Sequence, residues 1–160
     1  MVIDSTYEKK LIEIIHSSPM LVEVFELSRK TELTEYYIGA GCIAQTVWNY
    51  SLGNPLGYGI DDIDIIYFDT DLSYEKEDRI INKCKEVYCK LPIKVDEKNQ
   101  ARVHLWYKDK FGIDLKPYLS LEEAINSWPT TATLYNKTQE VEKNMAGIEC
   151  YTVVGAAALV

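Results

Sequence analysis

Gly59-Ile60-Asp61-Asp62-Ile63-Asp64-Ile65-Ile66-Tyr67-Phe68 is the stretch of the chain that decides its fold. Apart from Asp64, residues 63–68 form an apolar run, which is typical of a central strand. Successive side chains of a strand point to opposite faces, so Asp62 and Asp64 share one face, about 7 Å apart. The sequence therefore predicts a buried strand that carries two carboxylates on the same side.

These two carboxylates need a positively charged partner, because burying an unpaired charge in a sheet is costly. Neither lysine nor arginine occurs between Tyr50 and Tyr74. A hard, oxygen-binding divalent ion such as Mg²⁺ or Mn²⁺ is the natural partner. The other interpretation is that the strand begins after Asp64 and that both aspartates lie in a solvated loop.

A strand, a glycine turn and a helix precede the aspartates. Residues 36–38 are β-prone and stop at Gly39 and Gly41, after which apolar residues recur at helical spacing over 43–52. Glycines let backbone amides approach a ligand, and the N-terminus of the following helix favours a phosphate. The turn is thus a candidate phosphate site, with an ordinary tight turn as the alternative.

The remaining pattern predicts the other elements and a single domain over residues 1–160, with a C-terminus whose last residues resemble a cut end. Helices interleaved with strands indicate an α+β domain with a mixed sheet, of the α/β type. Trp48 and Trp128 are expected in the core. Further helices are expected over 5–15, 18–27, 73–91 and 120–129, and further strands over 93–96, 101–107 and 148–154.

The composition limits the partners of the chain. Apolar residues make up 47% and charged residues 26%, which is typical of a folded protein in water. The absence of a bilayer-length apolar run or a secretory signal predicts a cytoplasmic protein with no membrane partner. A net charge of -8 repels phosphate backbones, so long nucleic acid is not expected as a partner.

Four stretches in this order resemble the DNA polymerase β-like nucleotidyltransferase superfamily. That superfamily has Gly and then Gly or Ser at a helix start, Asp-x-Asp on the next strand, and a third carboxylate on a neighbouring strand. More closely, the chain resembles an uncharacterised family of bacterial nucleotidyltransferases. The resemblance covers about residues 36–133, and the matching stretches lie within 41–49, 59–64, 99–106 and 128–133.

The resemblance implies a polymerase β palm-like nucleotidyltransferase fold with flanking helices, and it assigns catalytic and metal-binding roles. Asp62 and Asp64 match the metal-binding pair of the superfamily. Asp96 is the candidate for the third carboxylate, as both a catalytic and a metal-binding residue. Asp114 and Glu97 are the next candidates if Asp96 does not lie beside the pair.

The predicted nucleotide contacts come from two segments. Gly39, Gly41 and Cys42 match the turn that holds the nucleotide phosphates, with Cys42 where Ser or Gly is usual. Arg102 and His104 alternate with apolar residues in a predicted strand, so both are expected on one face, where they contact phosphate or acceptor. The alternative for each is pairing with nearby acidic side chains.

The implied activity is metal-dependent transfer of a nucleoside monophosphate from an NTP to an acceptor hydroxyl, with Mg²⁺ or Mn²⁺ as cofactor. The acceptor is a small molecule, a protein or an RNA end. One alternative is a nucleotide-binding module of the same fold with weakened catalysis, which Cys42 favours. The other is a haloacid dehalogenase-like phosphatase, because residues 65–71 resemble the strand and Asp-x-Asp opening of those enzymes.

Overall fold

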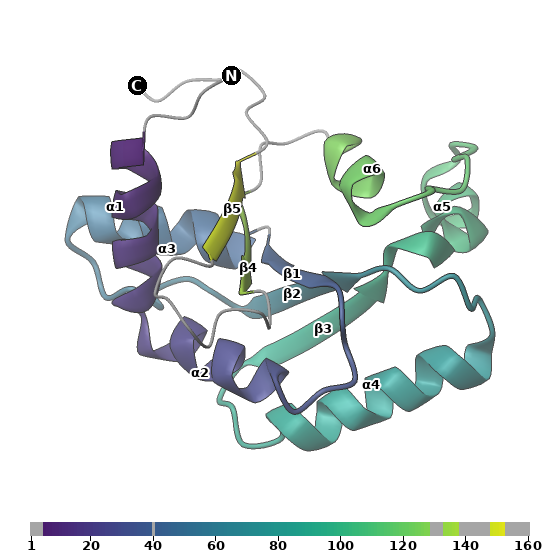
Figure 1. The fold of residues 1–160 in the computed structure, drawn as a ribbon, viewed down its shortest axis with the longest axis horizontal. Coiled ribbons are helices and arrows are strands. Elements are labelled where there is room, and N and C mark those ends of the chain that lie inside the picture. The colour runs from purple at the N-terminus through teal and green to yellow at the C-terminus, as the bar shows by residue number, and fades with distance from the viewer. Residues whose placement is uncertain (1–4, 40, 129–132, 138–147, 153–160) are drawn as a thin grey trace.

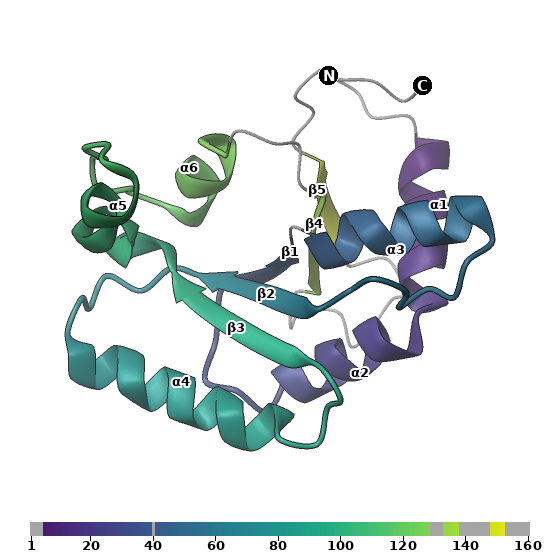
Figure 2. The same cartoon turned by 180° about the vertical axis from the view of Figure 1, so that it is seen from behind.

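The computed structural model describes residues 5–39, 41–128, 133–137 and 148–152. Among them, five strands form one sheet in the order β3-β2-β1-β4-β5 (Figures 1 and 2). The strands are β1 (Tyr36–Gly39), β2 (Asp62–Tyr67), β3 (Lys94–Asn99), β4 (Thr133–Lys137) and β5 (Ile148–Thr152). The helices are α1 (Ser5–His16), α2 (Pro19–Ser28), α3 (Gly41–Leu52), α4 (Tyr74–Tyr88), the 3-10 helix η1 (Gln100–Arg102), α5 (Val103–Phe111) and α6 (Leu121–Asn126).

Strand β2 lies at the centre of the mixed part of the sheet. It pairs antiparallel with β1 and parallel with β3, and α4 makes the crossover between the two parallel strands. In this register Asp64 lies between Gly39 on one side and Asp96 on the other. The predicted α+β fold with a mixed sheet is confirmed, whereas β4 was not predicted.

The two faces of the sheet have different roles. The main core lies on one face, where α1 to α4 pack against side chains that include Ile38, Ile63 and Ile65. On the other face, Tyr37 and Ile66 pack against α6. Because side chains alternate along β2, Asp62 and Asp64 lie on this second face, away from the main core.

Serine side chains start three of the helices, as the sequence predicts for each. Ser18 accepts a hydrogen bond from the Leu21 N–H at 3.4 Å, and Ser73 accepts one from the Lys76 N–H at 3.4 Å. Ser120 accepts one from the Glu123 N–H at 3.1 Å. Each cap satisfies a backbone donor that the first turn of a helix leaves unpaired, which fixes where the helix begins.

The prediction of a strand over 101–107 is wrong, because this segment forms η1 and α5. The buried side chain of Asn99 accepts hydrogen bonds from the Ala101 N–H at 3.0 Å and the Asp69 N–H at 3.1 Å. It also donates to the Asp69 carbonyl at 3.0 Å. Asn99 therefore joins the ends of β2 and β3 and turns the chain into a helix, which ends at Gly112 with a φ of 71°.

The two tryptophans expected in the core differ from one another. Trp48 is 58% exposed on α3, so its prediction is wrong. The buried positions of α3 are Cys42, Ile43, Thr46 and Asn49, which leaves position 48 on the outer side. Trp128 is partly buried and packs against the cluster on the second face of the sheet.

Glu97 lies on the core side of β3 and makes the stability of the protein depend on pH. Burial raises the pKa of Glu97 from 4.5 to about 7, with a smaller contribution from the charge of Asp96. An acid whose pKa is raised by folding favours the folded state while it is protonated, and this stability is lost as the pH rises from about 4.5 through about 7. We expect Glu97→Gln to raise the melting temperature at pH 8 and to change it little at pH 5.

Glu86→Gln is the matched control for this prediction, because Glu86 is exposed on α4 and pairs with the half-exposed Lys83 at 3.7 Å. Its effect on the melting temperature should be small and similar at both pH values. The melting temperatures of the two variants and the parent chain are measured at pH 5 and pH 8 by circular dichroism. A Glu97→Gln variant that melts lower than the parent at pH 8 contradicts the prediction.

Candidate active site

Three aspartates lie on the second face of the sheet, the face opposite the main core. Asp62 begins β2 and is exposed, whereas the Asp64 side chain is 24% exposed. Asp96 is the register partner of Asp64 on the adjacent parallel strand, so both carboxylates lie on the same face. The placement of Asp96 on a strand beside Asp64 agrees with the sequence prediction.

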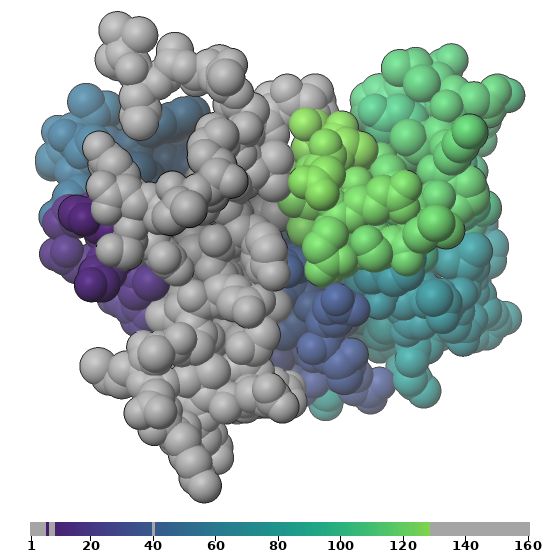
Figure 3. Space-filling view, turned by 45° about the horizontal axis from the view of Figure 1, so that its top comes forward, coloured from purple at the N-terminus to yellow at the C-terminus, as the bar shows by residue number. Residues whose placement is uncertain are grey.

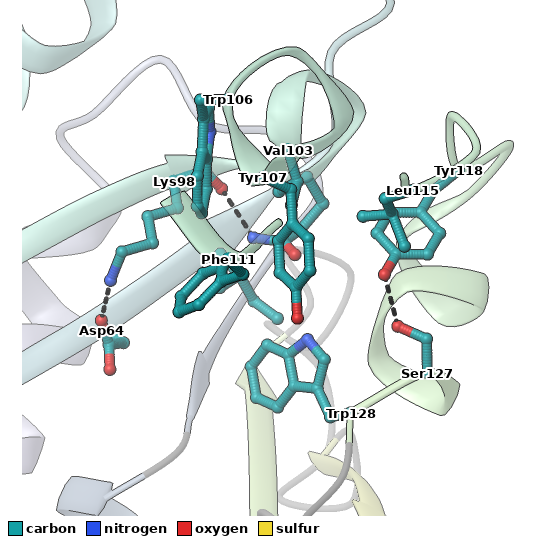
Figure 4. A pocket seen from close by; sticks show the side chains of 12 residues that line it. Asp64, Lys98, Val103, Trp106, Tyr107, Phe111, Leu115, Tyr118, Ser127 and Trp128 are labelled. Atoms are coloured by element: carbon teal, nitrogen blue, oxygen red, sulfur yellow. Dashed lines mark hydrogen bonds and ion pairs between the residues drawn. The ribbon is translucent and has the colours of Figure 1, made fainter. Parts of the chain in front are cut away.

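Lys98 bridges two of these aspartates, and the sequence analysis missed it. Its Nζ donates to Asp64 Oδ1 at 2.5 Å (Figure 4). The same Nζ lies 3.1 Å from Asp96 Oδ2. Burial alone lowers the pKa of Lys98, but hydrogen bonds and charge from Asp64 and Asp96 outweigh it and raise the pKa above its usual value. The alternation Lys94-x-Asp96-x-Lys98 in β3 is the pattern that places Lys98 on the same face as Asp96.

The chemistry of this cluster fits a cation. Asp64 and Asp96 converge on one positive charge, the Lys98 ammonium, and carboxylate oxygens are the ligands that Mg²⁺ and Mn²⁺ prefer. In the part of the chain that the structure describes, no three His, Cys, Asp or Glu side chains are arranged to hold a metal ion. Two carboxylates, those of Asp64 and Asp96, thus share one cation position, and Lys98 occupies it.

The glycine turn lies directly beside the carboxylates. Gly39 ends β1 opposite Asp64, and α3 begins at Gly41. A Cβ added to Gly41 would meet no heavy atom within 4 Å, so the backbone there faces open space. The helix dipole favours an anion at the start of α3.

The Cys42 side chain is not part of this open turn. It is buried, and its Sγ donates to the Gly39 carbonyl at 3.2 Å. Burial, and secondarily the charge of Asp64, raises the pKa of Cys42 to about 12, so the thiol stays neutral. Any contact of Cys42 with a phosphate would come from its backbone.

An aromatic pocket adjoins the carboxylate cluster. Its volume is about 340 Å³, and Asp64 and Lys98 form part of its edge (Figure 4). The walls include Ile66 of β2, the rings of Trp106, Tyr107 and Phe111 on or at the end of α5, and Trp128 after α6. The sequence analysis missed this pocket because it predicted a strand for the residues that form α5.

A family model described as nucleotidyltransferase matches residues 26–160 of the chain. The match spans the glycine turn, β2, β3 and the pocket. The chain belongs to this nucleotidyltransferase family. Membership indicates transferase chemistry but names no acceptor.

One solved structure shows the same fold. It is an NMR structure reported to reveal a CCA-adding enzyme head domain, with a TM-score of 0.69 and 23% sequence identity. The alignment covers 92% of this nucleotidyltransferase and 72% of that chain. The polymerase β-like fold is therefore confirmed. A search of curated proteins finds no match.

Two of the predicted nucleotide contacts of this nucleotidyltransferase are not on a common strand face, because Arg102 ends η1 and His104 lies in α5. Arg102 is buried, with its Nε 3.0 Å from Glu77 Oε2, and it donates to the Leu72 carbonyl. Its guanidinium also lies 4.5 Å from the centre of the Tyr74 ring. Arg102 thus holds the start of α4, and the alternative of pairing with an acid is the one that the structure supports.

His104 has a different environment in α5. Its Nδ1 atom is buried and has no hydrogen-bond partner among the described residues. His104 is not among the residues that line the pocket. Its proposed contact with phosphate or acceptor therefore remains a prediction.

The fallback candidates for the third carboxylate lie elsewhere in the nucleotidyltransferase. Glu97 is on the core side of β3, because it pairs in register with the buried Ile65. Asp114 is largely exposed and lies 2.7 Å from Lys108 Nζ. Asp96 therefore remains the acidic side chain that the register places beside Asp64.

The phosphatase alternative loses its support once the family is known. The aspartates that suggested it have local roles: Asp69 lies 3.4 Å from Lys76 Nζ, and Asp71 accepts a hydrogen bond from the Ser73 N–H at 3.0 Å.

No helix among the described residues is both long and apolar enough to cross a bilayer.

Proposed function

We propose that this chain transfers a nucleoside monophosphate from an NTP to an acceptor hydroxyl, using Mg²⁺ or Mn²⁺ held by Asp62, Asp64 and Asp96. The observation that carries the proposal is the register of three strands, which sets Asp64 between Gly39 and Asp96. Carboxylates that suit a cation thus lie next to the glycine turn that leads into α3, whose N-terminus suits a phosphate. The family of the chain supports the same chemistry.

Each part of the site has a defined task in this reaction. The acceptor oxygen attacks the α-phosphorus and pyrophosphate leaves on the opposite side, so no covalent enzyme intermediate is needed. A bound divalent ion would stabilise negative charge on the attacking and leaving oxygens. Asp64 and Asp96 would hold that ion together with Asp62, and the start of α3 at Gly41 would bind the tail phosphates.

Lys98 acquires a second task in the loaded site. Its ammonium pairs with both Asp64 and Asp96 in the structure, and Lys94 also pairs with Asp96, at 3.6 Å. If a divalent ion took these carboxylates, the Lys98 ammonium would stay beside them, where it could donate hydrogen bonds to a phosphate oxygen of the NTP.

Thermal stability tests binding directly. We expect NTP with Mg²⁺ at about a hundred times the dissociation constant to add about 2.7 kcal/mol of stability, or about 5 to 10 °C in melting temperature. Asp62→Asn and Asp64→Asn should each remove this gain, because each deletes one carboxylate of the site. No shift with any of the four NTPs at millimolar Mg²⁺ or Mn²⁺ would count against the proposal.

Transfer is tested separately, with NTPs labelled at the α-phosphate and candidate small-molecule, protein and RNA-end acceptors. A net charge of -8 disfavours long nucleic acid among them. The second candidate function is a nucleotide-binding module without catalysis, which the ion pairs of Lys98 with Asp64 and Asp96 favour. Binding without transfer to any acceptor would support that module over the enzyme.

A further inference from the structure

The glycine turn and the aromatic pocket lie on opposite sides of Asp64. Strand β1 runs antiparallel to β2 and ends with Gly39 opposite Asp64, so the chain continues from there toward the Asp62 end of β2. The pocket instead adjoins Ile66 and Lys98, which are register partners one pleat beyond Asp64 in the other direction. Figures 1 and 2 show the same arrangement, with α3 near the end of β2 where the strand begins and the α5–α6 pair near the end where it stops.

This arrangement matches the stereochemistry of phosphoryl transfer. The attacking oxygen and the leaving group lie roughly in line on opposite sides of the phosphorus. If the start of α3 holds the departing pyrophosphate, the acceptor hydroxyl must approach from the far side of Asp64, and the pocket opens there. We propose that the aromatic pocket is the acceptor site and that it takes a small, uncharged ring compound with a free hydroxyl. This inference rests on the proposed function.

The lining of the pocket defines the chemistry of the acceptor. Three aromatic rings come from one helical segment, with the Tyr107 and Phe111 centroids 4.6 Å apart and those of Trp106 and Phe111 6.4 Å apart. Such rings offer flat faces on which another ring can stack. A sugar ring and a nucleoside share the needed chemistry, which is a flat face with a hydroxyl at its edge.

The charges and polar groups of the pocket also favour a small, uncharged acceptor. The two charged residues among the described lining, Lys98 and Asp64, lie together at the edge next to the carboxylate cluster, and the rest of that lining is uncharged, so the body of the pocket suits an uncharged acceptor. Tyr118 and Ser127 place a hydroxyl pair at the edge, 2.6 Å apart, which can hydrogen-bond to a polar ligand. The volume of about 340 Å³ suits a compact molecule.

Figure 3 shows that the α5–α6 part lies at one end of the molecule, apart from α1.

Tryptophan fluorescence tests binding without any need for transfer. The chain has three tryptophans, of which Trp106 and Trp128 line the pocket and Trp48 does not. In a Trp48→Phe background the remaining fluorescence therefore reports on the pocket. The probes are phenyl β-D-glucopyranoside, adenosine and a short single-stranded RNA with a free 3′ hydroxyl. We expect saturable quenching by at least one of the two small probes.

Phe111→Ala and Ile113→Ala form a matched pair of variants. Both side chains are about half exposed, at 51% and 58%, so neither truncation should unfold the chain, but only Phe111 lines the pocket. Phe111→Ala should weaken binding of the small probe about tenfold, within the range for loss of one stacking partner. It should raise the KM for that acceptor by a similar factor, while the thermal shift with Mg²⁺ and NTP stays unchanged. Ile113→Ala should alter none of these values.

Several results overturn the inference. If neither small probe gives saturable quenching, the proposed ring-binding site is overturned. The same holds if Phe111→Ala and Ile113→Ala bind the small probe equally well. Binding or labelling of the RNA alone overturns a small-molecule acceptor. If Phe111→Ala weakens the NTP shift instead of acceptor binding, the pocket holds the nucleotide and not the acceptor. If the ring probes bind as expected but no NTP shifts the melting temperature, the ring site is supported and nucleotidyl transfer is overturned.

Discussion

Replacing Asp64 with asparagine is expected to lower the rate of nucleotidyl transfer by about 10³-fold or more. Asp64 is the carboxylate that the register places between the glycine turn and Asp96. Charge stabilisation by a metal ion is worth several kcal/mol in the transition state, and each 1.36 kcal/mol changes the rate about tenfold. The amide keeps the size of the side chain but removes the negative charge that would hold the ion in the proposed function.

Asp61→Asn is the matched control for this loss, because Asp61 is exposed and precedes β2. It makes the same change of charge three residues away and should leave the rate nearly unchanged. The Asp64→Asn variant should still fold, since Lys98 keeps Asp96 as a partner at 3.1 Å. Initial rates with α-labelled NTP make the measurement. Equal losses in the two variants would show that general electrostatics, rather than a site at Asp64, sets the rate.

Arg102→Met is expected to destabilise the folded chain by about 3 to 5 kcal/mol, the range for breaking a buried ion pair by removing one partner. The Arg102 side chain is only 6% exposed and lies 3.0 Å from Glu77, which is 25% exposed. The variant leaves Glu77 and the Leu72 carbonyl without their cationic donor and removes the contact with the Tyr74 ring. Methionine fills similar space, so the loss is chiefly electrostatic.

A second arginine provides the comparison for Arg102. Arg79 on α4 pairs with Glu32 at 3.2 Å, but their side chains are 60% and 50% exposed. Arg79→Met should therefore cost no more than about 1 kcal/mol. Urea unfolding at pH 7 measures both variants. If Arg102→Met unfolds no more readily than Arg79→Met and instead raises the KM for NTP, Arg102 is a substrate contact after all.

The position of the carboxylates could be predicted because it depends on strong local rules. The side-chain period of a strand fixes Asp62 and Asp64 to one face wherever the strand is paired. A strand-helix-strand crossover returns the chain beside its starting strand, which places Asp96 next to Asp64. Both rules act within residues 62–96 and need no knowledge of the rest of the fold.

The helical form of residues 100–111 could not be predicted from the same kind of pattern. Apolar side chains at 101, 103 and 105 satisfy the period of a strand, while Val103, Tyr107 and Phe111 satisfy that of a helix. The choice between them depends on Asn99, whose side chain bonds to Asp69, distant in sequence. Because the pocket is built on this helix, it was missed together with it.

Lys98 was missed for a related reason. Near Asp62 and Asp64 along the chain, between Tyr50 and Tyr74, no lysine or arginine occurs. The actual partner comes from the next strand, with which β2 pairs in register. Charge pairing across a sheet becomes visible only when the strand order is known.

The attachment of Lys98 to the strand that carries Asp96 has a thermodynamic consequence. Its ammonium competes for the carboxylates at an effective concentration set by the reach of one side chain, as a tethered module competes with a free one. Dialysis and chelation cannot dilute a tethered competitor, so the carboxylates keep this counterion when free cations are removed near neutral pH. In the proposed function, loading of the site would be an exchange of a built-in monovalent cation for a free divalent one.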